Sequence, residues 1–390
     1  MADVAVVGAG VAGLCVAAEL ARHGLSVTVV ERRYPGGGNT TRNVGRVRRV
    51  QLTPELTALA VRAHDTWHRL EGLTGGRSSL VYPTRYAWVL YEDDERERLA
   101  TLEPMWRELD ARAGIVDRAA TLRAVPVLEG GEEPVGAILG EAAIVHHDAA
   151  LAGLLLACRE AGVELQRGVR ATGLQLAAGR VAGLETDAGT VTAATVVNAA
   201  GAEAGTVGEL LGAPLALSPV RREALVCRPS RPFMSPAVTF YRPQEGWFNQ
   251  TLRGELVAGS IDPAEEPGFR EDASFRFLTR TARLLLRKAP RLGGLHVIRQ
   301  WAGAYELTPD RAPLIGGHGS VPGLYTLAGW SGRGLLLAPI AAELAAREIA
   351  GLGRDPLLAP FHPDRFVDGA LPPETGGDYY ARYLDARRTV

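Results

Sequence analysis

The chain has 390 residues, and its 43 lysines and arginines nearly balance its 44 aspartates and glutamates, which gives a formal net charge of −1. This balance, without a long basic run, argues against a nucleic-acid-binding protein. No apolar run reaches the roughly 18 residues that a membrane-spanning helix needs. The first predicted strand begins almost at the N-terminus, so we expect no signal peptide and a cytoplasmic protein.

The three cysteines, Cys15, Cys158 and Cys227, form no CxxC pair, and no cysteine or histidine cluster has the spacing of metal ligands. We therefore expect free thiols and no metal site. The length allows two domains or one large interleaved domain.

The start of the chain has the pattern strand, glycine turn, helix, strand. Two apolar runs, 4–7 and 25–30, flank the sequence Gly-Ala-Gly-Val-Ala-Gly and a helical pattern that continues to about His23. Glu31 follows the second run, about twenty residues after the glycines, where an acidic residue binds a ribose hydroxyl. This context predicts a dinucleotide-binding βαβ unit.

Each glycine of the turn has a separate predicted role. Gly8 permits the tight turn, Gly10 admits the pyrophosphate, and Gly13 allows close packing of helix and strand. The pyrophosphate is expected at the helix N-terminus, beside Val11 and Ala12, because free N–H groups and the helix dipole favour an anion there.

Further elements alternate along the rest of the chain. Glycines and small hydroxyls predict a loop over 32–48, and Asp148 is the predicted N-cap of a helix. The antiparallel sheet is expected between 238 and 261. Predicted helices span 54–73, 93–113, 147–161 and 274–288, with another from about 335. Predicted strands span 80–91, 163–165, 169–176, 180–186, 190–192, 195–198, 238–242, 246–252, 255–261 and 324–328.

Four motifs carry a resemblance to a known family. They are the N-terminal glycine turn with Glu31, Gly-Asn-Thr-Thr-Arg-Asn at 38–43, Val-Asn-Ala-Ala-Gly at 197–201, and Thr-Pro-Asp at 308–310 with Gly-Trp-Ser-Gly-Arg-Gly at 329–334. In this order they resemble the flavoprotein family of D-amino-acid oxidase, glycine oxidase and sarcosine oxidase. The second motif is most similar to the beta subunits of heterotetrameric sarcosine oxidase and to related proline dehydrogenases.

The resemblance implies an α/β fold, in which a Rossmann-like FAD-binding domain is interleaved with a substrate domain built on an antiparallel sheet. The expected FAD-binding segments are 1–80, 140–215 and 305–365, and the substrate segments are 81–139 and 216–304. The remainder, 366–390, is a predicted C-terminal tail.

The resemblance also implies FAD as the cofactor. Glu31 and Arg32 are expected beside the adenosine ribose, and the backbone of Val169 beside the adenine. The helix N-terminus after the second glycine loop would stabilise negative charge on the reduced flavin. The full expected set is Gly8, Gly10, Val11, Ala12, Gly13, Glu31, Arg32, Asn39, Thr40, Thr41, Arg42, Asn43, Val44, Gly45, Val169, Ala200, Gly201, Gly303, Trp330, Ser331, Gly332, Arg333, Gly334, Leu335 and Leu336.

The family reaction removes a hydride from the carbon next to an amine, after which the imine hydrolyses and the electrons pass to O2 or another acceptor. Sarcosine is the leading expected substrate, with glycine, proline or another N-methyl amino acid as alternatives. Arg48 matches the arginine that binds the substrate carboxylate in sarcosine oxidases, and Arg333 is a second candidate. Arg42, Arg46 and Arg49 are alternatives to Arg48.

Tyr241, Tyr305 and Trp247 belong to aromatic segments expected over the flavin face, with packing in the core as the alternative. Tyr241 and Tyr305 are the predicted catalytic aromatics.

Departures from the family pattern bear on the cofactor. Gly303 stands where monomeric sarcosine oxidase has the cysteine that bonds its flavin, so we expect non-covalent FAD. Leu336 replaces that enzyme's lysine. His147 either begins a helix or links a second flavin, as a histidine does in the heterotetrameric enzymes.

Two other functions stay open from the sequence. One is the flavin subunit of a multi-subunit dehydrogenase that passes electrons to a partner, and the other is a flavin protein of tRNA modification or another reductase. The sequence leaves the oligomeric state open between monomer, homo-oligomer and hetero-oligomer.

Overall fold

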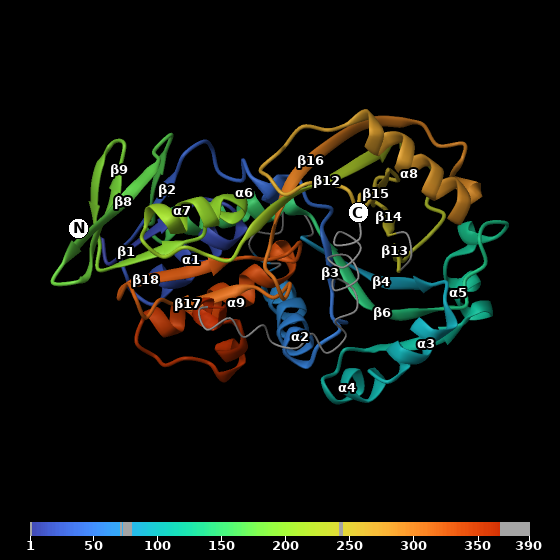
Figure 1. Ribbon diagram of the computed structural model, residues 1–390, viewed down its shortest axis with the longest axis horizontal. Coiled ribbons are helices and arrows are strands. Elements are labelled where there is room, and N and C mark those ends of the chain that lie inside the picture. The colour runs from blue at the N-terminus through green and yellow to red at the C-terminus, as the bar shows by residue number, and fades with distance from the viewer. Residues whose placement is uncertain (1, 71, 73–79, 242–244, 367–390) are drawn as a thin grey trace.

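The computed structural model describes residues 2–70, 72, 80–241 and 245–366. Two large sheets lie side by side, each covered by its own helices (Figure 1). The predicted tail after Phe366 and the predicted element ends at Leu73 and Arg242 fall outside the described residues.

The first sheet contains the predicted βαβ unit. Its strands run parallel except for the edge strand β17, which pairs antiparallel with β18. The helices α1 (Val11–Arg22), α6 (His147–Glu160) and α9 (Gly334–Ile349) share one core with it. In order across the sheet, the strands are β17 (Leu314–Gly317), β18 (Leu324–Ala328), β11 (Thr195–Asn198), β1 (Val4–Val7), β2 (Val27–Glu31) and β7 (Glu164–Arg167).

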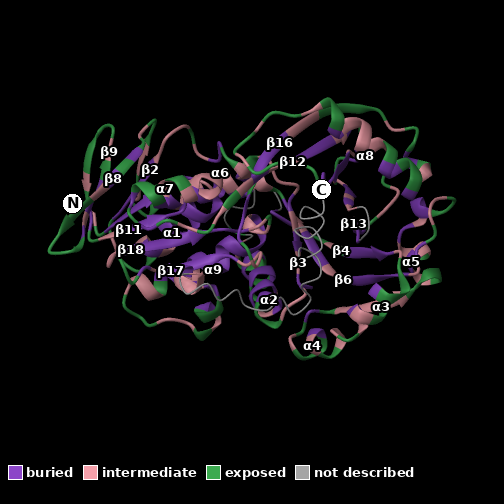
Figure 2. Cartoon of the chain, in the orientation of Figure 1, coloured by how far each residue is buried: buried purple, intermediate pink, exposed green. Residues whose placement is uncertain are grey.

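A small antiparallel sheet packs on the opposite face of the first sheet. The helix α7 (Ala204–Leu210) contacts the same hydrophobic core. It consists of β10 (Gly189–Thr192), β9 (Arg180–Thr186) and β8 (Ala171–Ala177). Ala178 and Gly179 join β8 to β9 with φ of 50° and 76°, the left-handed pair that a tight hairpin turn needs. Buried residues concentrate in β1, β11 and α9, whereas the tip of this hairpin is exposed (Figure 2).

The second sheet is antiparallel except where β13 runs parallel to β4. The helix α8 (Phe275–Lys288) packs on one face, and Ser274 caps it by accepting from the Phe277 N–H at 3.2 Å. In order, the strands are β16 (Val297–Leu307), β12 (Ser218–Cys227), β15 (Leu256–Ser260), β14 (Gly246–Gln250), β13 (Ala237–Phe240), β4 (Val81–Leu90), β6 (Gly136–Val145) and β3 (Arg46–Arg48), with β5 (Ala113–Asp117) also on β6. The antiparallel sheet predicted between 238 and 261 is confirmed.

The short elements complete the described chain. Thr53 caps α2 (Pro54–Arg69) by accepting from the Leu56 N–H at 3.3 Å. No helix of the described ranges has the length and apolar character to cross a membrane. The remaining elements are α3 (Asp93–Ala100), α4 (Glu103–Glu108), α5 (Arg118–Ala124), η1 (Asn39–Thr41), η3 (Pro126–Leu128), η4 (Gly201–Glu203), η5 (Pro290–Leu292), η6 (Pro356–Phe361) and η7 (Pro363–Phe366).

Two predictions about helices were wrong. The single helix expected over 93–113 is two short helices followed by β5, because Pro104 lies in the first turn of α4 and cannot donate the backbone bond of a continuous helix. Asp148 is not the N-cap of α6: the Nδ1 atom of His146 accepts from the Ala149 N–H at 3.3 Å. Asp148 lies in the first turn instead, where the helix dipole favours its charge.

The chain crosses between the sheets several times. The first sheet takes its strands from 4–31, 164–167, 195–198 and 314–328, and the second from 46–145 and 218–307. β3 lies in the stretch predicted as a loop, yet it pairs with β6 of the second sheet. The Rossmann-like sheet interleaved with an antiparallel sheet is confirmed, while the exact domain boundaries stay a prediction.

Candidate functional site

A cavity of about 560 Å³ runs from the glycine turn of the first sheet to the face of the second. Gly8 and Gly10 line one end, and Trp88, Thr239 and Trp247 line the other. Because the cavity contacts both sheets, it brings together segments that lie far apart in the sequence.

The glycines of the first turn have two different roles, close packing of the backbone and access to the cavity. Gly8 has φ of 104°, and a Cβ there would lie 2.6 Å from the Ala199 carbonyl oxygen. A Cβ on Gly13 would lie 1.9 Å from the Gly8 carbonyl oxygen, and Gly13 does not line the cavity. Gly10 lines the cavity, and a Cβ there would meet the Thr40 hydroxyl oxygen at 3.1 Å. Gly8 and Gly13 therefore fix the turn, whereas Gly10 keeps it open to a ligand.

The loop containing η1 forms hydrogen bonds with both α1 and β16. The Thr40 hydroxyl oxygen accepts from the Val11 N–H at 3.0 Å, and the Asn39 amide oxygen accepts from the Ala304 N–H at 3.1 Å. Trp301 of β16 donates its ring N–H to the Arg42 carbonyl at 2.8 Å. The loop residues 39, 40 and 42–45 line the cavity. Thr41 does not line it, because its hydroxyl bonds the Gly36 carbonyl at 2.9 Å.

Glu31 ends β2 at the place where the sequence predicts a ribose contact. Its carboxylate accepts from the Ala9 N–H at 2.9 Å and the Arg33 N–H at 2.7 Å, which holds it against the glycine turn. Arg32 forms an ion pair with Glu203, and both line the cavity. Val169, Ala200 and Gly201 also line this end.

Arg48 lies at the other end of the cavity. Its Nη1 donates to the Tyr86 hydroxyl at 2.8 Å, and its Nε donates to the Val50 carbonyl at 3.3 Å. Its guanidinium carbon lies 5.0 Å from the Trp88 ring centroid. Arg49 directly follows β3, forms an ion pair with Asp65 at 2.8 Å and does not line the cavity.

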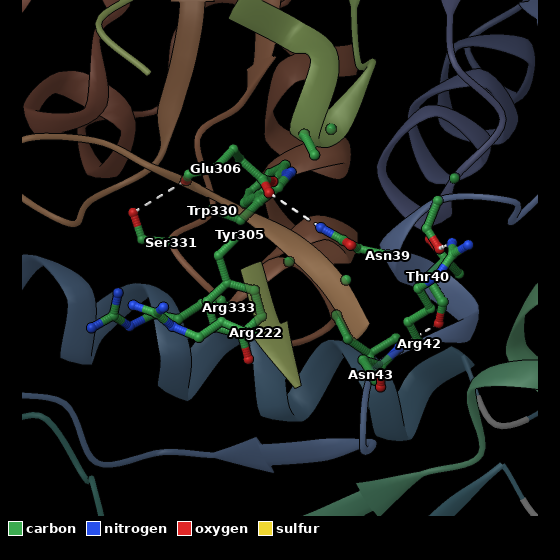
Figure 3. Close-up of a pocket in the computed structure, with 18 of the residues that line it drawn as sticks. Asn39, Thr40, Arg42, Asn43, Arg222, Tyr305, Glu306, Trp330, Ser331 and Arg333 are labelled. Carbon is green, nitrogen blue, oxygen red and sulfur yellow. Dashed lines mark hydrogen bonds between the residues drawn. The ribbon is translucent and has the colours of Figure 1, made fainter. Parts of the chain in front are cut away.

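Tyr305 and Arg333 line the cavity from β16 and from the second glycine loop. A Cβ on Gly332 would lie 2.4 Å from the Tyr305 ring, so that loop packs directly on the ring. Arg222 lies with its guanidinium carbon 6.0 Å from the same ring, and Figure 3 shows it beside Tyr305 and Arg333. Arg333 donates from Nε to the Gln51 side-chain oxygen at 3.1 Å. Part of its guanidinium is therefore engaged within the protein.

The structure does not bring Tyr241 to the cavity. It is fully buried, its ring packs edge-on against Trp88 at 5.1 Å, and its hydroxyl accepts from Arg98 of α3 at 3.1 Å. The prediction of Tyr241 as an active-site residue is therefore corrected: Trp88, on the adjacent strand, lines the cavity and Tyr241 supports it from the core. His147 also does not line the cavity; it begins α6.

Several lining residues were missed by the sequence reasoning, namely Trp88, Thr239, Arg222 and Glu306. Glu306 is buried on β16, with its carboxylate 3.5 Å from the Asn39 side-chain nitrogen (Figure 3). Burial raises the pKa of Glu306 to about 7. An acidic residue inside the otherwise apolar run at 302–307 was the available signal, because isolated carboxylates are rarely buried without a role.

These residues fit an extended dinucleotide. With Gly13 and Thr41 excepted, every residue expected at FAD lines the cavity. The cavity offers a helix N-terminus at the glycine turn, a carboxylate at the ribose position, and the start of α9 at its far end. Gly303 faces this space, and a Cβ there would lie 2.7 Å from the Asn39 side-chain oxygen.

Comparison with known proteins agrees with this geometry. The beta subunit of sarcosine oxidase from Rhodobacter capsulatus is 27% identical over 94% of this chain and 89% of its own length. A glycine oxidase from Pseudomonas putida is 30% identical over 93% of this chain and 98% of its own length. The crystal structure of L-proline dehydrogenase from P. horikoshii superposes with a TM-score of 0.88 at 25% identity, over 95% of this chain and 99% of that one.

The family model described as FAD dependent oxidoreductase matches residues 3–348, which is most of the chain. The expected cofactor and enzyme class are thereby confirmed. The protein belongs to the family of FAD-dependent oxidoreductases.

Proposed function

We propose that the protein oxidises the amine of a small amino acid, with Arg48 binding the substrate carboxylate. The observation that carries this proposal is the position of Arg48 in the cavity, beside Trp88 and at the end opposite the glycine turn. Among the residues that the structure describes, no carboxylate oxygen lies within 4.0 Å of its guanidinium. A cation held in this way calls for an anionic ligand.

The hydrogen bonds of Arg48 prepare one edge of the guanidinium for a carboxylate. Val50 takes the Nε hydrogen and Tyr86 takes one Nη1 hydrogen. The second Nη1 hydrogen and the two on Nη2 form the fork that binds a carboxylate through two parallel bonds. The side chain is also packed on two aromatic rings, so little freedom is lost when the substrate binds.

The lining around Arg48 forms an apolar slot for the rest of the substrate. Leu52, Trp88 and Trp247 contribute to it. Such a slot excludes water and orients the carbon next to the substrate amine. The amine must be neutral when the hydride leaves that carbon. FAD, when bound, supplies the hydride acceptor. The imine product then hydrolyses in water.

Sarcosine is the proposed substrate of first choice, and glycine, proline and other N-methyl amino acids are the alternatives. The beta subunits of sarcosine oxidase and the glycine oxidases among the relatives support this range. We propose O2 as the electron acceptor, with H2O2 as its product. Loss of a hydride from the sarcosine methyl group, followed by hydrolysis, yields glycine and formaldehyde in equal amounts.

The test is to incubate the purified FAD-loaded protein with sarcosine in air and to measure all three products. Equal amounts of formaldehyde, glycine and H2O2 support the proposal. Absence of formaldehyde with sarcosine, together with absence of H2O2 with glycine and proline, contradicts it.

A second candidate is the flavin subunit of a multi-subunit dehydrogenase. The likeness to proteins named as subunits favours it, because those relatives are matched over nearly their full length. In that case the flavin is reduced by substrate but reoxidised slowly in air, and an artificial dye acceptor restores turnover. A native mass measurement of the protein from its own host then gives a hetero-oligomer rather than a monomer or homo-oligomer.

A further inference from the structure

We propose that the cavity holds a second anion site at Arg46, which refines the substrate proposed above from sarcosine to a small amino acid that carries a second carboxylate. This inference rests on the proposed function, because it takes Arg48 as the site of the first carboxylate.

Arg46 and Arg48 point to the same space because they are two residues apart on one strand. β3 spans Arg46–Arg48, successive side chains of a strand alternate between faces, and both arginines line the cavity. Val47, between them, is fully buried in the core instead. The strand therefore presents two guanidinium groups side by side to one ligand.

The two guanidinium groups occupy separate positions. Arg46 reaches past β6 and β4 to β13 and β14, where its Nη1 donates to the Thr239 hydroxyl at 3.1 Å and its guanidinium carbon lies 4.7 Å from the Trp247 ring centroid. Thr239 also accepts from the Tyr86 hydroxyl at 2.6 Å, and Tyr86 accepts from Arg48 at 2.8 Å. Two hydroxyl groups thus stand between the two cations and fix their spacing.

The charge of this pair is not neutralised by the protein. In the described part of the chain, neither Arg46 nor Arg48 has a carboxylate oxygen within 4.0 Å, whereas the half-buried Arg221 pairs with Glu265 at 3.0 Å. Burial first, and then the charge of Arg48, lowers the pKa of Arg46. Two neighbouring cations with little water are costly unless an anion joins them. A ligand with two carboxylates satisfies both.

The hydrogen bonds to Val238 and Thr239 leave N–H groups of Arg46 available to that ligand. Nη1 donates to Thr239 and to the Val238 carbonyl at 3.2 Å, so Nη2 and Nε remain for a carboxylate. The Trp247 ring supports the guanidinium of Arg46 from one face. Aromatic rings attract guanidinium groups in this arrangement. One aromatic ring and two hydrogen bonds therefore hold the Arg46 guanidinium in place.

The first test measures binding without turnover. The FAD-loaded protein is titrated with acetate, malonate, succinate and glutarate, and the change in flavin absorbance gives each dissociation constant. We expect at least one dicarboxylate to bind about tenfold or more tightly than acetate, since a charged hydrogen-bonded pair contributes that much. The best chain length reports the spacing of the two arginines. If no dicarboxylate binds better than acetate, the inference is wrong.

The Arg46→Met variant tests the assignment to this residue, because methionine retains contact with Trp247 but has no charge. We expect the dicarboxylate advantage over acetate to fall to less than about twofold. An equal loss for acetate and for the dicarboxylates means that both arginines share a single carboxylate, and an unchanged advantage means that Arg46 only ties β3 to β13. Either result overturns the inference. The Arg46→Lys variant, which keeps the charge, is expected to retain part of the advantage.

A second test uses a matched pair of amines. Iminodiacetate is sarcosine with a carboxymethyl group in place of the methyl group, and each is mixed anaerobically with the FAD-loaded protein. We expect iminodiacetate to half-saturate flavin reduction at a concentration about tenfold or more below that of sarcosine, and Arg46→Met to bring the ratio near one. A ratio near one in the parent protein contradicts the second anion site. If neither amine reduces the flavin while a dicarboxylate still binds tightly, the proposed function fails and the anion pair stands.

Discussion

A Cβ atom on Gly13 would lie 1.9 Å from the carbonyl oxygen of Gly8, so the first turn of α1 rests directly on the turn that follows β1. The neighbouring Gly10 has no such backbone contact, because a Cβ there would meet the Thr40 hydroxyl oxygen at 3.1 Å. Two glycines of one motif are thus required for different reasons, one for packing and one for access to the cavity.

The Gly13→Ala and Gly10→Ala variants separate these roles. Gly13→Ala should lower the free energy of unfolding of the flavin-free protein by about 1–3 kcal/mol or more, since backbone must move to admit the methyl group. Gly10→Ala should leave that free energy nearly unchanged and weaken FAD binding. Denaturant unfolding and FAD titration measure the two effects, and a stable Gly13→Ala protein that binds FAD normally would contradict the packing argument.

Arg48→Ala should raise the dissociation constant of the substrate or of acetate by about tenfold to a hundredfold, because a charge-assisted pair is lost. The flavin spectrum should stay close to that of the parent protein. Titrations followed by flavin absorbance measure both properties. Loss of flavin instead would make Arg48 a cofactor residue.

Arg49, which directly follows β3, provides the matched control. It is 2% exposed, pairs with Asp65, and does not line the cavity. Arg49→Ala should therefore reduce the free energy of unfolding by about 1–3 kcal/mol through a lost ion pair and a cavity, and leave carboxylate binding unchanged. Weaker carboxylate binding with unchanged stability would reverse the assignments of the two arginines.

Glu306 makes the stability of the flavin-free protein depend on pH. Its pKa of about 7 is raised above its ordinary value near 4.5 by burial, so the folded protein keeps a proton that the unfolded chain has lost between these values. Stability is therefore full below about pH 4.5 and falls as pH rises to about 7, by roughly 3 kcal/mol in total. Glu306→Gln should remove this fall.

Denaturant unfolding between pH 4.5 and 8 measures the Glu306 effect. Glu209, exposed on α7, supplies the control, and Glu209→Gln should follow the pH profile of the parent protein. A Glu306→Gln profile parallel to that of the parent would show that folding does not raise the pKa of this carboxyl.

Acid precipitation of the holoprotein should release all of its FAD into the supernatant. Gly303 faces the cavity, and the cysteines Cys15, Cys158 and Cys227 are buried elsewhere without lining it. No thiol is therefore placed to form a thioether with the flavin. Yellow colour that remains in the precipitate would contradict non-covalent binding.

The features that the sequence predicted well are those whose signal is local. The βαβ unit is visible because glycines, apolar runs and Glu31 occur within 31 residues, and the Ala178–Gly179 turn because only a few residues tolerate its backbone. The second sheet was predicted only in part. Composition marks 46–48 as loop, yet these residues form β3 by pairing with β6, nearly a hundred positions away.

The end of the cavity near Arg48 is formed by contacts that the spacing of residues in the sequence does not reveal. Tyr241 lies in the core, where its hydroxyl accepts from Arg98 of α3, a residue 143 positions away in the sequence. The sequence alone does not distinguish Arg46 from the other arginines near Arg48. In the structure both lie on β3, where a spacing of two residues puts their side chains on one face. Glu306 is a candidate site residue because it is buried beside Asn39, a contact between segments 267 residues apart in the sequence.

Anaerobic reduction of the bound flavin tests the central claim most directly. The FAD-loaded protein is mixed in turn with sarcosine, glycine, L-proline, D-alanine and iminodiacetate, and the flavin absorbance is followed before and after air is admitted. We expect rapid bleaching by at least one of these amines, with a loss of rate in the Arg48→Ala variant at low substrate concentration. Flavin that stays oxidised with every one of them would contradict the assignment of this protein as an amino-acid oxidoreductase.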